Sequence, residues 1–176
     1  MTASRLAAAL AGMVTALLLQ ATLLGPLTFP VPVSLPALLV ILVGCYAGPG
    51  IGMSFGFATG LLTDLGSGLP AGTQALCWLA AGLVAGSLGG LASSRGTRAV
   101  AGLAAVLAAA SSATSGVLLA ILGSPGASLA TAAAGVVPVG LIDALLALLL
   151  APLVRGLLRG QGIRPPRPVG TLVGGR

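Results

Sequence analysis

The sequence predicts an all-α, polytopic membrane protein with six transmembrane helices. The composition predicts a membrane protein, because 57% of the residues are hydrophobic, 6% are charged and the mean hydropathy is +1.14. A soluble domain has roughly a quarter of its residues charged. Long apolar runs predict the helices, and the positions of the arginines predict how many of them cross.

Six apolar runs account for the predicted spans. They extend over residues 6–24, 37–47, 51–65, 73–92, 99–122 and 129–154. A helix needs about 20 residues to cross roughly 30 Å of hydrocarbon. The first run ends at "GPLTFPVPVSLP", whose prolines interrupt a helix. The second and third runs are short and are joined by "GPG", so we expect them to cross as a tight hairpin.

The charged residues test this number of spans. The chain has eight arginines, no lysine and two acidic residues. With six spans every arginine falls on one side of the membrane: Arg5, Arg95, Arg98, Arg155, Arg159, Arg164, Arg167 and Arg176. Positive residues favour the cytoplasmic side, so both termini are predicted to be cytoplasmic. The chain then divides into a transmembrane domain, residues 1–155, and a basic cytoplasmic tail, residues 156–176, that we expect to be disordered.

The inventory of reactive side chains excludes most enzyme sites. The chain has no histidine, lysine or glutamate, and both cysteines, Cys45 and Cys77, lie in apolar runs. No metal site, no cofactor site and no enzymatic activity are therefore expected. The net charge of +6 raises the possibility of nucleic acid, but aromatic residues are 3% and the arginines lie outside the apolar runs. Neither a nucleic acid nor a small-molecule substrate is expected, and membrane lipid is the predicted surrounding.

Glycines recur at every fourth position in "GPGIGMSFGFATGLLTD", and the next step of this series is Asp64. Such spacing places small surfaces on successive turns, where another helix can approach closely. We interpret the series as a packing ridge within the bundle, with an interface to another protein as the alternative. The candidates for helix packing or partner binding are Gly52, Gly56, Gly60, Asp64, Pro70, Gly72, Gly82 and Gly86.

The two acidic residues have different predicted roles. Asp64 lies near the outer end of its run, where it either hydrogen-bonds the following "GSG" turn or acts as a structural lock or partner contact. Asp143 lies well inside the last run, where a charge costs at least about 2.5 kcal/mol. It is the buried-acid candidate and should face the bundle or a wet cavity. Pro138 and Gly140 precede it and predict a kink, or a locally opened backbone if the protein is a transporter.

The order of several segments resembles the bacterial rod shape-determining MreD family. These are "LLLQATLL", a proline-containing loop, "SLPALLVILVG" and "GFATGLLTDLGSGLPAGTQALCWLAAGLVAG". In that family a span ending in G-x-x-x-G-x-x-x-D precedes a short proline-and-glycine turn and another glycine-bearing span. The matching positions are Gln20, Gly56, Gly60, Asp64, Pro70, Gly72, Gly82 and Gly86. The resemblance covers roughly residues 6 to 90; beyond Arg95 only hydrophobicity, length and span count agree.

The resemblance implies a non-enzymatic scaffold of the cell-elongation machinery in the bacterial inner membrane. Its implied partners are MreC, the actin-like MreB, RodA and the penicillin-binding transpeptidase. The family is also similar in architecture to the six-helix S components of energy-coupling-factor vitamin importers. The alternative function is therefore a substrate-binding subunit, with Trp78, Gln74, Asp64 and Asp143 as the few polar or aromatic groups for a pocket. A channel or carrier would have only Asp143 and the cluster of serines at 111–115.

Overall fold

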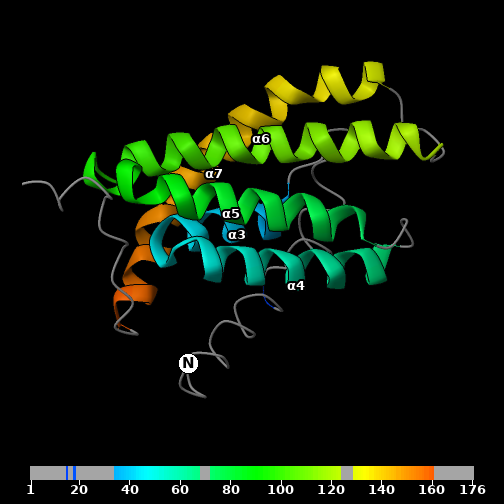
Figure 1. Cartoon of the computed structure of the whole chain (residues 1–176). Coiled ribbons are helices and arrows are strands. Elements are labelled where there is room, and N and C mark those ends of the chain that lie inside the picture. Colours follow the sequence, from blue (N-terminus) through cyan, green and yellow to red (C-terminus); the bar gives the residue numbers. More distant parts are fainter. Residues whose placement is uncertain (1–14, 16–17, 19–33, 68–71, 124–128, 161–176) are drawn as a thin grey trace, which may run out of the picture.

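The computed structural model of the chain describes residues 34–67, 72–123 and 129–160, together with Thr15 and Leu18. This part is all-helical and contains no strand, which confirms the all-α part of the predicted fold class. Its helices are α3 (Leu35–Ala47), α4 (Pro49–Ser67), α5 (Thr73–Ser94), α6 (Thr97–Ile121) and α7 (Leu129–Gly160). Figure 1 shows them as a bundle in which consecutive helices run in opposite directions.

Three of the described helices are long and apolar enough to cross a membrane: α5, α6 and the part of α7 from Gly140 to Leu158. The six predicted spans are therefore not supported. Helix α3 is apolar but has 13 residues, about 20 Å at 1.5 Å per residue. Helix α4 has 19 residues, among them glycines, hydroxyl residues and Asp64, and it is not one of the helices apolar enough to cross. The first predicted run, residues 6–24, lies outside the described residues.

The predicted turn "GPG" is shorter in the structure. Only Gly48 separates α3 from α4, and its φ of +94° is one that L side chains rarely adopt. Pro49 is the first residue of α4, a position that proline tolerates because the first N–H of a helix has no intrahelical partner. The chain therefore reverses at one residue, and α3 and α4 form a tight helical hairpin.

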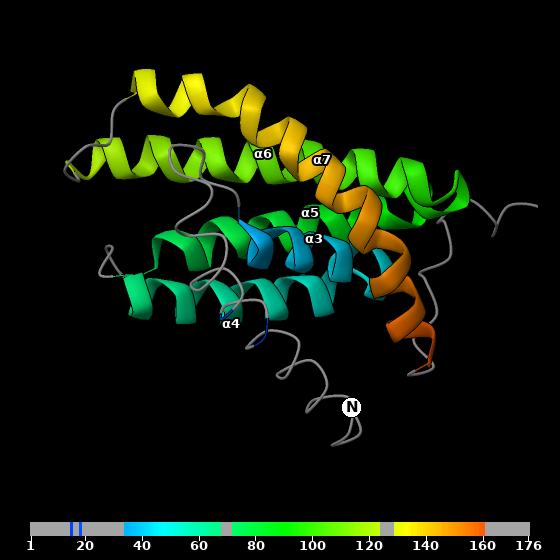
Figure 2. The same ribbon diagram turned by 180° about the vertical axis from the view of Figure 1, so that it is seen from behind.

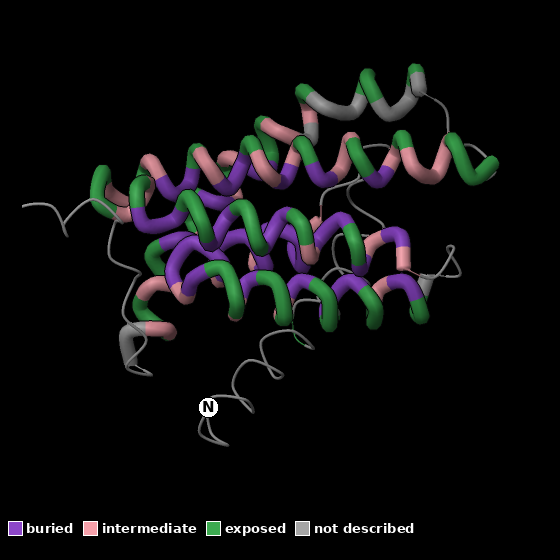
Figure 3. Tube along the Cα trace, viewed as in Figure 1, coloured by how far each residue is buried: buried purple, intermediate pink, exposed green. Residues whose placement is uncertain are grey.

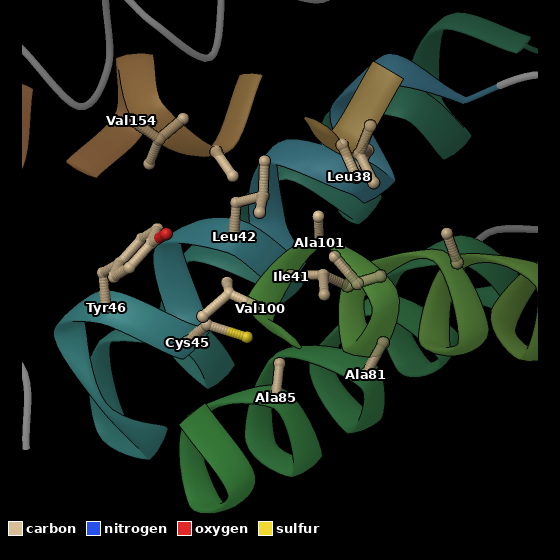
Figure 4. Packing of buried hydrophobic residues seen from close by; sticks show 14 residues of the cluster. Leu38, Ile41, Leu42, Cys45, Tyr46, Ala81, Ala85, Val100, Ala101 and Val154 are labelled. Atoms are coloured by element: carbon tan, nitrogen blue, oxygen red, sulfur yellow. The ribbon is translucent and has the colours of Figure 1, made fainter. Parts of the chain in front are cut away.

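The shortest helix lies at the centre of the bundle. Helix α3 contacts α4, α5, α6 and α7, and most of its length is buried (Figure 3). Its side chains Leu38, Ile41 and Leu42 are fully buried against small residues of the surrounding helices (Figure 4). Ser34 begins the helix, and its hydroxyl accepts a hydrogen bond from the N–H of Ala37 at 3.4 Å.

The two ends of the bundle differ in charge. At one end α5 leads into α6 through Gly96, and the side chain of Arg155 from α7 contacts Thr97 of α6. We call this the arginine end, because all the described arginines lie near it. At the opposite end, the aspartate end, Asp64 near the end of α4 meets the start of α5. Figure 1 shows the arginine end at the left and the aspartate end at the right.

Helix α7 is longer than predicted and bends. It continues to Gly160, so the first residues of the predicted tail are helical; the remainder of the tail lies outside the described residues. Prolines 138 and 152 lie inside the helix, where each lacks a backbone N–H and disfavours a straight course. Figure 2 shows that α7 starts beside α6 and changes direction along its length.

Candidate functional site

The glycine series of α4 packs directly on α5. A Cβ atom on Gly52 would lie 2.5 Å from the carbonyl oxygen of Gly82, and a Cβ on Gly82 would overlap the Gly52 carbonyl. These are backbone atoms, which cannot move aside as the end of a flexible side chain can. The two helices therefore touch backbone to backbone at this point, an approach that only glycine permits on both sides.

The next two glycines of α4 continue the same contact. A Cβ on Gly56 would overlap the carbonyl oxygen of Trp78 and lie 3.0 Å from Cγ1 of Val40. On Gly60 it would lie 2.5 Å from Cα of Ala75. The series thus follows α5 over its first three turns, in antiparallel register. Trp78 is buried at the same interface and fills the space between α4, α5 and α3.

Asp64 ends this ridge by binding the start of α5. Its carboxylate accepts hydrogen bonds from the backbone N–H of Gly72 at 2.9 Å, of Gln74 at 3.0 and 3.1 Å, and of Ala75 at 3.2 Å. The first N–H groups of a helix have no partner within the helix, and its dipole favours a negative charge there. Asp64 is buried, with 2% of its surface exposed. It therefore caps α5 and fixes the end of α4 against it.

The turn between α4 and α5 contributes one residue that the structure describes. Gly72 has a φ of +96° and is the N-cap of α5, where glycine provides the backbone conformation and Asp64 provides the hydrogen-bond acceptor that glycine lacks. Pro70 lies outside the described residues. Gly86 closes the other end of the ridge, because a Cβ on it would overlap Pro49 at the start of α4.

A second ridge on α5 faces α3, and the sequence pattern did not single it out. A Cβ on Gly44 would lie 2.8 Å from the Gly82 carbonyl oxygen and 3.2 Å from Cβ of Ala85. A Cβ on Gly89 would overlap Cys45. The small residues Ala81, Ala85 and Gly89 recur at every fourth position, one place before Gly82 and Gly86. This spacing was the available signal for a second packing face.

One side-chain hydrogen bond joins α5 to α6 near the aspartate end. The hydroxyl of Ser115 donates to Oε1 of Gln74 at 2.7 Å. Ser111, one turn earlier on α6, donates to the carbonyl of Ala108 within its own helix. Both serines are buried. The hydroxyls of Ser111 and Ser115 are therefore used in helix-backbone bonding and in helix packing.

Asp143 lies apart from the ridge. It is buried in α7, with 1% of its surface exposed, and shares a helix face with the core residues Ala147 and Ala151. Its Oδ1 atom has no hydrogen-bond partner among the described residues. The structure therefore does not bring the two acids together: Asp64 is at the aspartate end of α4, and Asp143 is inside α7.

The described residues offer no cluster for a metal ion, since no group of three or more His, Cys, Asp or Glu side chains comes together in them. Cys45 and Cys77 are buried free thiols. The candidate site is therefore the α4–α5 interface with its aspartate cap, and what it does is hold two helices in one register. The described fold and site define a helical protein with apolar helices of membrane-spanning length. Comparison with protein-family models, curated proteins and solved structures finds no match.

Proposed function

We propose that this protein is a non-enzymatic scaffold of the cell-elongation machinery in the bacterial inner membrane, acting in cell shape and peptidoglycan synthesis. One observation carries the proposal. The positions that resemble the MreD family and are described, Gly56, Gly60, Asp64, Gly72, Gly82 and Gly86, all belong to the α4–α5 interface. A pattern shared with a family is informative when its separated residues meet in one structural element.

The chemistry of the described side chains supports a scaffold over an enzyme. Asp64 is bound to three backbone N–H groups and Ser115 to Gln74, so these polar groups stabilise the bundle. The outward faces of the helices carry large apolar side chains, such as Leu141 and Leu145 of α7 and Leu76 of α5. Such faces suit contact with lipid or with the apolar helices of other membrane proteins.

The proposal includes six spans with both termini in the cytoplasm. The described arginines, Arg95, Arg98, Arg155 and Arg159, gather at the end where α5 leads into α6 and α7 ends. Positive residues favour the cytoplasmic side, so the arginine end is assigned to the cytoplasm. Residues 6–24 would supply a further span, and α3 and α4 would cross as the hairpin that Gly48 permits. The proposed partners are MreC, RodA and the penicillin-binding transpeptidase within the membrane, and MreB on the cytoplasmic side.

The test is co-purification of an MreC homologue from the source organism with the full chain and with two variants. Gly60→Leu places a large side chain against Ala75 of α5, whereas a Cβ atom at Gly50 meets no atom of a neighbouring helix within 4 Å, so Gly50→Leu is the control. We expect Gly60→Leu to lose the MreC homologue and to fail in supporting rod shape, and Gly50→Leu to retain both. Normal elongation and normal protein level in the Gly60→Leu strain would contradict the proposal.

The alternative, a vitamin-binding S component, is less favoured by the same residues. Asp64 is bound within the turn, and Trp78 is 3% exposed and packed between helices. Two of the few groups available for a pocket are therefore used in packing. Retention of a vitamin by the purified protein would favour this alternative instead.

A further inference from the structure

Three arginines lie on the segments that meet where α5 leads into α6. Arg95 ends α5 and Arg98 lies in the first turn of α6, on either side of Gly96 and Thr97. Arg155 reaches the same turn from α7, where its Nη1 donates to the hydroxyl oxygen of Thr97 at 3.2 Å. Arg95 and Arg98 are exposed and Arg155 is half-buried. Two segments distant in the sequence thus place three arginines at the same end of the bundle.

No acidic side chain of the described residues balances these charges. Asp64 is bound to the start of α5 at the opposite end of the bundle. Asp143 precedes Arg155 by three turns of α7, about 18 Å at 1.5 Å per residue. Thr97 accepts a hydrogen bond from Arg155 but is neutral. The positive charge of these arginines is therefore left to solvent or to an external anion.

Arg98 lies at the end of α6 where a positive charge is least favourable. The N-terminus of a helix carries partial positive charge and favours a nearby anion over a cation. Arg98 lies in the first turn of α6, and Gly96, the N-cap, has no side chain to accept a hydrogen bond from the helix. The hydrogen bond from Arg155 to Thr97 adds a third positive group close to this turn. An anion at this turn would therefore meet the positive end of α6 and the side chain of Arg155, with the exposed Arg95 and Arg98 beside it in the sequence.

We propose that the Arg95, Arg98 and Arg155 cluster binds the phosphate of an anionic phospholipid. We take the phosphate to be that of a lipid because the cluster lies at the ends of α5, α6 and α7, the three described helices of membrane-spanning length. Phospholipid phosphates lie at this level of a bilayer, and guanidinium groups bind them through paired hydrogen bonds. Helices α5 and α7 also offer exposed apolar side chains near this end, Leu91, Leu153 and Leu157, to the acyl chains. The site does not depend on the proposed scaffold role.

The experiment measures lipid retained by the full chain after reconstitution in vesicles of equal parts phosphatidylcholine and phosphatidylglycerol. Mild detergent releases the protein, and native mass spectrometry counts the lipids bound. We expect retention of phosphatidylglycerol over phosphatidylcholine. The variant Arg95→Gln/Arg98→Gln/Arg155→Gln should lower that ratio by about tenfold or more, since each arginine near a membrane surface contributes attraction.

A matched control removes the same charge elsewhere. Arg164→Gln/Arg167→Gln/Arg176→Gln changes three arginines of the tail, and we expect it to keep the parent ratio. An equal loss in both triple variants would overturn the site, because net charge would then explain the retention. Equal retention of the two lipids by the parent would overturn it too. Displacement of the lipid by inorganic phosphate would overturn the lipid as the ligand.

A single variant covers the case in which the triple variant does not fold. Arg98 is exposed, so Arg98→Gln should fold as the parent does and lower the ratio by about fivefold. A parent-like ratio for Arg98→Gln, with the fold intact by circular dichroism, would contradict the role of Arg98. Retention of an acidic protein in place of lipid at the parent cluster would also contradict the proposal.

Discussion

The backbone N–H of Gln74 donates to both carboxylate oxygens of Asp64, with its nitrogen 3.0 Å from Oδ1 and 3.1 Å from Oδ2. The two residues belong to different helices. An acid near the end of its own helix is disfavoured by that helix's dipole, but here the start of α5 supplies the compensating positive end. A single side chain thus closes the turn, caps one helix and holds another in place.

Removing the Asp64 carboxylate should therefore destabilise the bundle. For Asp64→Ala we expect the free energy of unfolding to fall by about 2 kcal/mol, because the N–H groups of Gly72, Gln74 and Ala75 lose their acceptor. The measurement is unfolding by sodium dodecyl sulfate in micelles, followed by fluorescence of the buried Trp78. Thr63→Ala is the control, since the Thr63 hydroxyl donates to the Thr59 carbonyl of its own helix. Equal stability of Asp64→Ala and the parent would contradict the capping role.

The glycines of α4 should differ sharply in their tolerance of one methyl group. Gly56→Ala places its Cβ on the Trp78 carbonyl, and we expect a loss of about 2 kcal/mol in the free energy of unfolding. Gly50 and Gly66 belong to the same helix, but a Cβ atom at either would meet no neighbouring atom within 4 Å. Gly50→Ala and Gly66→Ala should therefore be as stable as the parent or slightly more stable. The same unfolding assay checks all three. A fall of similar size at Gly50 or Gly66 would show that helix propensity, and not the α5 contact, controls the effect.

Periodicity in the sequence located one face of the ridge but not what covers it. Glycines at every fourth position mark Gly52, Gly56 and Gly60 as one face of a helix. The same spacing on α5 exists twice, in adjacent stripes, and only the stripe through Gly82 and Gly86 was singled out. The one through Ala85 was missed because alanine is common in this chain and carries little positional information.

The burial of α3 could not be predicted from the lengths of the apolar runs either. Its sequence is apolar on every side, which is typical of a helix surrounded by others, yet the same pattern describes a helix surrounded by lipid. The structure distinguishes the two, because it places α3 against four other helices. The number of spans depended on α3, α4 and residues 6–24 together, and composition alone did not distinguish a short buried helix from a crossing one.

The hydrogen bond between Ser115 and Gln74 should contribute a measurable coupling between α5 and α6. In a double-mutant cycle with Ser115→Ala and Gln74→Leu, we expect a coupling energy of about 0.5 to 1.5 kcal/mol, as for other hydrogen bonds between membrane helices. The unfolding assay provides the four stabilities. Ser111→Ala paired with Gln74→Leu is the control, because the Ser111 hydroxyl bonds within α6. A coupling equal to that control would rule out a specific contact.

The orientation of the bundle can be checked with introduced cysteines. Ser94→Cys reports the arginine end and Leu122→Cys the aspartate end, and both positions are exposed. The native thiols should give little background, because Cys45 is 0% and Cys77 8% exposed. Under the proposed topology, with the arginine end in the cytoplasm, a membrane-impermeant maleimide should label Leu122→Cys in intact spheroplasts. Ser94→Cys should react only after permeabilisation, and the reverse pattern would contradict the assigned topology.

The two aspartates should respond in opposite ways to the same conservative change. Asp64→Asn loses a charge that three N–H groups bind, and we expect the free energy of unfolding to fall by about 1 to 2 kcal/mol. Asp143→Asn removes a carboxylate whose Oδ1 atom lacks a hydrogen-bond partner among the described residues. Burying such a group is costly, so this variant should be as stable as the parent or more stable. A fall at Asp143 as large as that at Asp64 would contradict this prediction, because it would mean that the Asp143 carboxylate has a hydrogen-bond partner in the folded protein.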